Sequence, residues 1–403
     1  MLNPAVARVN ARNAVIAGCL GWTLDAFDFF VLIFVVGAVA QDFGRSIPDI
    51  ALTITASLAT RPVGAFLFGL LADRYGRRKL LMADIVFYSL MEVMSGLARS
   101  YPVFFVLRLL YGVGMGGNWG VGASLALESV TPRWRGIVSG LLQSGYALGN
   151  VLAAVAYYTI FPRWGWRAMF FVGAFPAVVT LILCLKVEEP EAWQRTRTDW
   201  ISYRSAIFRN ARLFLYLVAL MAMMNFIAHG TQDMYPTFLQ QQRHFDVQST
   251  SVITLISMIG AILGGLSFGH FSNQFGRRRS MIAGVLLAVI AIPLWLLAPT
   301  KPLIIVGAFI MQFMVQGAWG VIPAHINELS PIQLRGFFPG FAYQLGVLIA
   351  STIIYAEARL AEHFSYGASM GFLAGAVLLI GAAVIWAGPE AKGASFLQKE
   401  ETA

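Results

Sequence analysis

The chain repeats itself at an offset of 200 residues, and this repeat constrains the fold more than any other feature of the sequence. The segment GLLADRYGRR that starts at Gly69 returns as GHFSNQFGRR from Gly269. A second pair of matching segments, at residues 128–136 and 328–336, keeps the same offset. We therefore expect two homologous halves that face each other.

The composition places both halves in a lipid bilayer. Hydrophobic residues make up 58% of the chain, charged residues only 12%, and the mean hydropathy is +0.69. A helix needs roughly 20 apolar residues to cross the hydrocarbon core. Because the apolar runs are continuous rather than alternating, we expect an all-α integral membrane protein with twelve transmembrane helices in two six-helix pseudo-repeats. The predicted spans are residues 14–38, 51–72, 80–98, 103–127, 136–159, 167–186, 213–239, 250–272, 281–298, 302–325, 336–357 and 367–387.

These spans divide the chain into four parts. We expect an N-terminal half at 1–187, a polar linker at 188–212, a C-terminal half at 213–388 and a polar tail at 389–403. The linker mixes aromatic residues with arginines, which suits a short amphipathic helix. The loops are too short for a soluble catalytic domain, and neither a nucleotide-binding loop nor a set of metal ligands is present in the sequence. We therefore expect neither an enzyme nor a cofactor.

The distribution of the basic residues along the chain indicates membrane topology rather than a nucleic-acid partner. With the amino terminus inside, the inner loops and tails hold 20 of the 29 Lys and Arg residues, and the outer loops hold seven. Such a bias is the positive-inside pattern of membrane proteins. We expect both termini in the cytoplasm and the chain in the inner (plasma) membrane, as a monomer.

The repeated segments predict a gate on the cytoplasmic side. An aspartate and several arginines lie where one helix ends and the next begins, so the carboxylate can cap a neighbouring helix and pair with arginine. The alternative is a basic loop that only sets topology, although that role requires no glycine or aspartate. The second copy has Asn273 in place of Asp73, so only the first half keeps the full charged pattern. The gating candidates are Gly69, Asp73, Arg74, Gly76, Arg77, Glu128, Arg135, Gly276, Arg277, Glu328 and Arg335. This repeated motif resembles that of the major facilitator superfamily along essentially the whole chain.

Charged residues inside the first half are candidates for proton coupling. Asp25 and Asp28 are three residues apart, on one face of the first span. Two carboxylates close together in lipid suit a group that loads and releases a proton, or one of them neutralises an arginine as a fixed partner. Arg61 suits a substrate carboxylate, with which an aspartate competes. Arg108 is either a structural partner of a buried carboxylate, such as Glu92, or part of proton coupling.

The seventh span carries the richest polar face. Asn225, His229, Gln232 and Asp233 recur at helical spacing, so one side of the helix cannot face lipid and must line a cavity or be paired. His229 and Asp233 form a plausible titrating pair. The alternative is a buried hydrogen-bond network that pins two helices together.

Residues 225–237 are similar to N-x-x-[S/T]-H-x-[S/T]-Q-D-x-x-x-T, the signature of the lactate and pyruvate permeases of the sialate:proton symporter family. The match fails only at Ala228. The resemblance implies uptake of a monocarboxylate with a proton by alternating access. It gives Asn225, His229 and Asp233 a part in binding or coupling, and Arg61 as a contributor. Weaker candidates for substrate contact flank the expected cavity: Asn118, Trp119, Gln312, Gln316 and Tyr343.

We thus expect a secondary active transporter whose partners are a small organic anion, protons and the bilayer. Lactate or pyruvate is the first expectation for the substrate, and sialic acid or an aromatic acid is the alternative. A receptor of the same fold that transports nothing is the alternative from another class, because fold does not fix function.

Overall fold

The computed structural model describes residues 4–195, 200–361, 363–394 and 396. Every secondary-structure element within these ranges is a helix, which confirms the predicted all-α class. Residues 196–199 of the expected linker and 397–403 of the expected tail lie outside the described residues.

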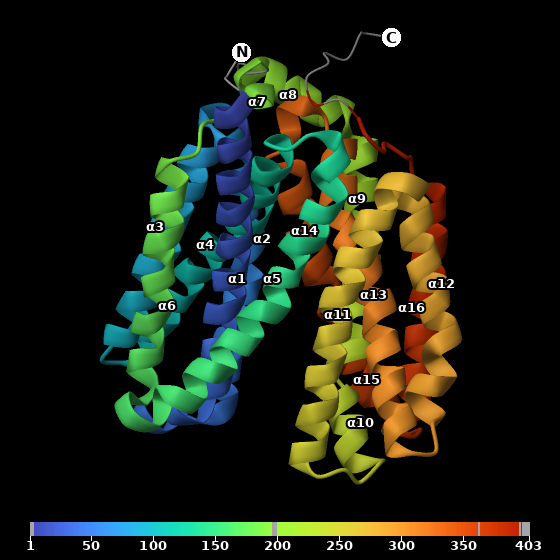
Figure 1. The fold of residues 1–403 in the computed structure, drawn as a ribbon. Coiled ribbons are helices and arrows are strands. Elements are labelled where there is room, and N and C mark those ends of the chain that lie inside the picture. Colours follow the sequence, from blue (N-terminus) through green and yellow to red (C-terminus); the bar gives the residue numbers. More distant parts are fainter. Residues whose placement is uncertain (1–3, 196–199, 362, 395, 397–403) are drawn as a thin grey trace.

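The helices form two bundles of corresponding elements (Figure 1). The first bundle contains α1 (Pro4–Asp42), α2 (Ile47–Tyr75), α3 (Arg77–Leu97), α4 (Tyr101–Glu128), α5 (Pro132–Thr159) and α6 (Phe161–Leu185). The second contains α9 (Ala211–Gln232), α10 (Tyr235–Gln241), α11 (Val247–Phe275), α12 (Arg277–Leu297), α13 (Lys301–Leu329), α14 (Phe338–Ala350), α15 (Ile353–Ala361) and α16 (Tyr366–Ala387). The repeat places a glycine with positive φ, Gly76 at 122° and Gly276 at 98°, at the two equivalent turns after α2 and α11. This conformation favours glycine and lets the next helix start at once.

Ten helical stretches in the described residues are long and apolar enough to cross a membrane. The other two predicted spans, the fourth and the eleventh, are not among these ten. Helix α4 has the required length, but it carries Arg108, Asn118 and six glycines, and it is almost wholly enclosed by other helices along its second half. The eleventh span consists of α14 and α15, each too short to cross alone. Together they complete the twelve-helix topology.

Two spans predicted to be continuous are broken. The seventh span divides into α9 and α10 around Asp233 and Met234. Pro236 explains the break, because proline has no amide hydrogen for the carbonyl of Gln232 and its ring collides with that carbonyl. The eleventh span is interrupted at Ser351 and Thr352 without a proline. Both breaks lie in the second half, so the duplicated bundles differ where their helices bend.

The two bundles meet at one end of the molecule and diverge toward the other (Figure 1). Helices α7 (Glu191–Arg195) and α8 (Trp200–Arg209), from the polar linker, lie at the end where the bundles meet, which we call the linker end. Helix α11 packs against α5, and α14 packs against α2 and α4.

Glycines allow the bundles to touch through their backbones at the linker end. A Cβ atom added to Gly69 would lie 2.9 Å from the carbonyl oxygen of Gly336, and one added to Gly136 would lie 2.0 Å from that of Gly269. The offset of 200 exchanges these two contacts, so they are equivalent positions of the duplicated fold. A side chain at these positions would force the halves apart.

Candidate functional site

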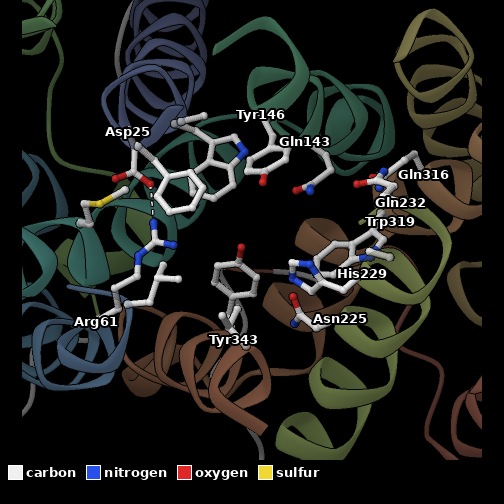
Figure 2. A pocket seen from close by; sticks show the side chains of 17 residues that line it. Asp25, Arg61, Gln143, Tyr146, Asn225, His229, Gln232, Gln316, Trp319 and Tyr343 are labelled. Carbon is white, nitrogen blue, oxygen red and sulfur yellow. Dashed lines mark hydrogen bonds and ion pairs between the residues drawn. The ribbon is translucent and has the colours of Figure 1, made fainter. Parts of the chain in front are cut away.

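A central hollow lies between the two bundles, and both contribute its walls (Figure 2). Helices α1, α2, α4 and α5 supply one side, and α9, α13 and α14 supply the other. The lining residues with polar or aromatic side chains are Trp22, Asp25, Phe29, Arg61, Gln143, Tyr146, Asn225, His229, Gln232, Gln316, Trp319 and Tyr343. Six of the nine residues proposed for substrate contact therefore line one space.

An ion pair forms one wall of the hollow. The Nη2 atom of Arg61 donates to Oδ2 of Asp25 at 2.8 Å, and both side chains are largely buried. The second carboxylate oxygen of Asp25 and Nε of Arg61 have no hydrogen-bond partner among the described residues. Of the two aspartates that could neutralise Arg61, the structure thus selects Asp25.

Asp28 points away from this wall, although it is only three residues from Asp25. It is 1% exposed and packs against Gly173 of α6, outside the lining of the hollow. Arg108 is instead paired with Glu92, the partner that the sequence offered as one alternative. The guanidinium also lies 3.8 Å from the ring centre of Tyr111. Asp28 is left with two buried carboxylate oxygens that have no partner in the described residues.

The polar face of α9 lies opposite the ion pair (Figure 2). Asn225, His229 and Gln232 line the hollow, as expected for a helix face that cannot meet lipid. His229 Nδ1 lies 2.9 Å from Oδ2 of Asp233, so the predicted pair forms. Asp233 itself lies at the break between α9 and α10, outside the lining.

Three candidates for substrate contact lie behind the wall. Asn118 donates to the carbonyl of Gly21 at 2.9 Å and joins α4 to α1. The Trp119 ring packs on Tyr343 with the ring centres 4.5 Å apart. Gln312 accepts from Nε2 of Gln232 at 2.7 Å. In this conformation these three residues position the lining rather than form it.

Three aromatic rings of the lining, those of Trp22, Phe29 and Tyr146, were not predicted from the sequence. Trp22 and Phe29 lie on the same face of α1 as Asp25, and the Trp22 ring stacks on Tyr146 with centres 6.0 Å apart. Their spacing from Asp25 was the available signal, because residues three and four apart share a helix face. Two further buried carboxylates, Asp84 and Glu357, were also missed.

The linker end is closed by Asp73 of the repeated motif. Its carboxylate accepts from the amide of Gly336 at 2.7 Å and from that of Phe337 at 3.1 Å, just before α14 begins. It also pairs with Arg77 and accepts from the Tyr203 hydroxyl at 2.8 Å. We call these contacts of Asp73 across the bundles the latch. Burial, followed by the neighbouring carboxylate, raises the pKa of Tyr203 on α8, which keeps its hydroxyl a donor.

The second copy of the motif makes the reciprocal contact. Asn273 accepts from the amide of Gly136 at 3.2 Å, so each motif bonds a backbone amide of the opposite half. Arg277 donates to both oxygens of Glu328 at 2.9 and 3.0 Å, and Arg135 of the first half lies 3.4 Å from the same carboxylate. Asparagine thus provides a hydrogen bond across the bundles as Asp73 does, but without its charge.

A residue of the predicted tail joins this network. The Phe396 ring lies between two guanidiniums, with the Cζ of Arg135 at 3.3 Å and that of Arg335 at 3.8 Å from its centre. Burial lowers the pKa of Arg335 to about 10, so it stays charged at neutral pH. The gating candidates Gly69, Gly76, Arg77, Glu128 and Gly276 lie at the same end. Whether these residues gate movement stays a prediction.

The site offers an arginine, a histidine, amides and aromatic rings. No group of three or more metal-ligating side chains occurs among the residues that the structure describes. The arrangement can bind a carboxylate at Arg61, hydrogen-bond polar substituents from α5, α9 and α13, and cover an apolar or ring-shaped body.

Comparisons with known proteins agree with this architecture. Residues 18–266 match the family described as Major Facilitator Superfamily, and residues 206–392 match that described as Sugar (and other) transporter. A carboxylic acid transporter protein homolog of Saccharomyces cerevisiae is 27% identical over 94% of this chain and 68% of its own length. The sialic acid transporter NanX of Escherichia coli is 27% identical over 92% of this chain and 93% of its own. The structure of the proton:xylose symporter XylE superposes with a TM-score of 0.79 at 17% identity, covering 96% of this chain and 98% of that one, which shows a shared fold.

Proposed function

Because this chain belongs to the major facilitator superfamily of membrane transporters, we propose that it carries a small organic carboxylate together with a proton. The linker end faces the cytoplasm in this proposal, in the inner membrane, as the excess of basic residues in the corresponding loops indicates. The structure then represents the conformation that is open to the outside and closed to the cytoplasm.

The Arg61–Asp25 ion pair in the wall of the hollow carries the proposal. Arg61 can serve either the aspartate or a substrate carboxylate, and its planar guanidinium suits both. A proton on Asp25 neutralises that side chain and frees Arg61 for the substrate. The anion therefore binds the protonated protein more tightly, and this difference in affinity is what symport requires.

The opposite wall supplies a second polar contact. His229 and Asn225 face Arg61 across the hollow, at a position where they can bond a hydroxyl or keto oxygen of the substrate (Figure 2). Lactate and pyruvate carry such an oxygen next to the carboxylate. The His229–Asp233 pair provides a further place for a proton in the second half.

The aromatic lining favours a second candidate substrate. Trp22, Tyr146, Trp319 and Tyr343 surround the hollow with flat surfaces that exceed what a three-carbon acid can cover. A cyclic carboxylate, either an aromatic acid or a sialic acid, would use these rings and keep the contact with Arg61. The names of the two relatives, for carboxylic acid and sialic acid transport, support both substrate classes.

Alternating access requires that the latch opens as the hollow closes. The contacts of Asp73 and Glu328 across the bundles would break, and the diverging ends would approach each other. Because the two bundles are related by the repeat, each can move as a rigid body about the contacts near the hollow.

The test uses purified protein in liposomes with radiolabelled lactate, pyruvate, sialic acid and benzoate. We expect one of these to accumulate when the outside is acidic and to stop accumulating when an uncoupler is added. Uptake that ignores both the pH gradient and the uncoupler would refute symport, and no uptake of any of the four would refute these substrate classes.

Two variants test the site. Arg61→Ala removes a charged donor and should lower kcat/KM by at least about hundredfold, the equivalent of one strong hydrogen bond to a charged group. Asp25→Asn should keep binding and lose the dependence on the pH gradient. Arg167→Ala is the matched control, because Arg167 forms an exposed ion pair with Asp42 far from the hollow and should transport normally.

A further inference from the structure

A carboxylate outside the hollow has no partner and no assigned role. Asp84 lies on α3, is 0% exposed, and neither of its oxygens has a hydrogen-bond partner among the described residues. Burying an ionised carboxylate without a partner is costly, so such a group is stable when it holds a proton. A packing role alone would be served by an apolar side chain at lower cost.

Charge balance in the middle of the first bundle supports this view. Away from the ion pairs at the linker end, four carboxylates are buried among the described residues of this bundle, from Asp25, Asp28, Asp84 and Glu92, against the two guanidiniums of Arg61 and Arg108. Arg61 is taken by Asp25 and Arg108 by Glu92. Asp28 and Asp84 are left over, so the bundle has two unpaired places for a proton rather than one.

Tyr88 lies near both unpaired carboxylates, with no hydrogen bond to either in this conformation. It lies one helical turn from Asp84 on α3, its buried hydroxyl has no partner in the described chain, and it interacts electrostatically with Asp84, Asp25 and Asp28. The groups that face Tyr88 and Asp84 from neighbouring helices are Asp25 and Asp28 of α1, Tyr111 of α4, Cys184 of α6 and, through its pair with Asp25, Arg61 of α2.

The position of Asp84 along α3 gives this chain of groups a direction. Asp84 follows Arg77 of the gate network by about two helical turns, or ~10 Å. It therefore lies between the central carboxylates and the linker end. Taken in the order Asp28, Tyr88, Asp84, these groups extend from the middle of the bundle toward the linker end, which opens when the latch breaks.

We propose that Asp84 is a second proton-binding residue, which releases the transported proton at the linker end and is refilled from Asp28 through Tyr88. When the linker end opens, the O–H bond of the Asp84 carboxyl breaks and its proton passes to water. The ionised Asp84 then takes the Tyr88 hydroxyl proton while Tyr88 takes the proton of Asp28. One O–H bond forms for each that breaks, and the proton of Asp28 is replaced in the outward-open state by way of Asp25, which lies three residues away on α1 and lines the hollow. This proposal rests on the proton symport proposed above.

The experiment separates net transport from exchange in liposomes. Asp84→Asn mimics the protonated carboxyl, so the loaded carrier should still exchange internal for external radiolabelled lactate, or benzoate if that is the acid the wild type takes, at the wild-type rate. Net uptake driven by a pH gradient should fall by about hundredfold, because a positioned proton-transfer group is lost. Ser95→Ala is the matched control on α3. It removes a fully buried hydroxyl that bonds only the carbonyl of Met91, and both activities should persist.

A second measurement does not depend on the substrate. Infrared difference spectra of the detergent-purified protein should show one protonated carboxyl band fewer in Asp84→Asn than in the wild type. An unchanged band, or normal net uptake by Asp84→Asn, would overturn the proposal. Equal loss of exchange in Asp84→Asn and Asp84→Glu would also overturn it, since that pattern marks a structural role. A wild type without proton-driven uptake would refute symport instead, while the infrared result would still decide whether Asp84 holds a proton.

Discussion

Removing the latch should shift the protein from one conformation to the other. The Asp73 carboxylate joins the bundles by accepting from the amides of Gly336 and Phe337. Hydrogen bonds to a charged group contribute about 1.5–3 kcal/mol each, so Asp73→Ala should weaken the closed linker end by about 3–6 kcal/mol. This corresponds to a shift of roughly 10²–10⁴ in the ratio of the two states.

Spin-label distances measure this shift directly. Tyr75 and Phe275 are exposed, occupy equivalent positions and lie at the linker end of opposite bundles. Ile47 and Val247 are the equivalent exposed pair at the other end. Labels on cysteines at these pairs, in a protein whose two native cysteines have been replaced, should report a longer distance at the linker end and a shorter one at the open end in Asp73→Ala.

The matched control is Asp49→Ala. Asp49 lies on the same helix at the opposite end, and its side chain bonds only Ser46 of its own helix cap among the described residues. Its loss should leave both distance distributions unchanged. If Asp73→Ala also leaves them unchanged in folded protein, the latch does not hold the linker end closed and the argument is wrong.

Three further predictions follow from contacts described above. Asn273→Asp turns a neutral hydrogen bond to Gly136 into a charged one and should stabilise the closed linker end by about 1 kcal/mol, seen as fewer long spin-label distances and a lower kcat. Phe396→Ala removes the ring between Arg135 and Arg335 and should favour the opened linker end by about 1–2 kcal/mol; the same labels would show no change if the ring is incidental. Gly64→Ala places a Cβ 1.6 Å from the carbonyl oxygen of Val113 and should destabilise the fold by about 1–3 kcal/mol, whereas Gly37→Ala, with nothing within 4 Å, should melt like the wild type.

The repeat and the hydropathy pattern were sufficient to predict the twelve-helix fold. They were insufficient to predict where helices bend. Pro236 signals the break in the seventh span, yet Pro62, Pro293 and Pro323 lie inside helices that continue. Neighbouring helices and waters can satisfy the carbonyl that a proline leaves free, so the bend depends on packing that a single sequence does not contain.

The candidate site shows the same division between local and tertiary information. Helical spacing correctly joined Asn225, His229 and Gln232 into one cavity face. It also placed Asp25 and Asp28 on one face, but α1 is surrounded by α2, α4, α5 and α6, and the two side chains meet different neighbours. For the same reason, the sequence alone could not decide which carboxylate pairs with Arg108. Asp84 was missed because its local sequence does not reveal that its side chain is buried without a hydrogen-bond partner in the described residues.

The backbone contacts between the bundles have a mechanical consequence. Where Gly69 meets Gly336 and Gly136 meets Gly269, neither surface carries a side chain that could interlock with the other. At the glycines themselves the bundles can therefore separate without any change of side-chain rotamers. The polar bonds of the latch and the neighbouring ring of Phe66, which packs against Phe337 and Phe341 of the other bundle, are what must be broken for the linker end to open. A single methyl group at Gly136 would collide with the carbonyl oxygen of Gly269 and prevent the linker end from closing fully.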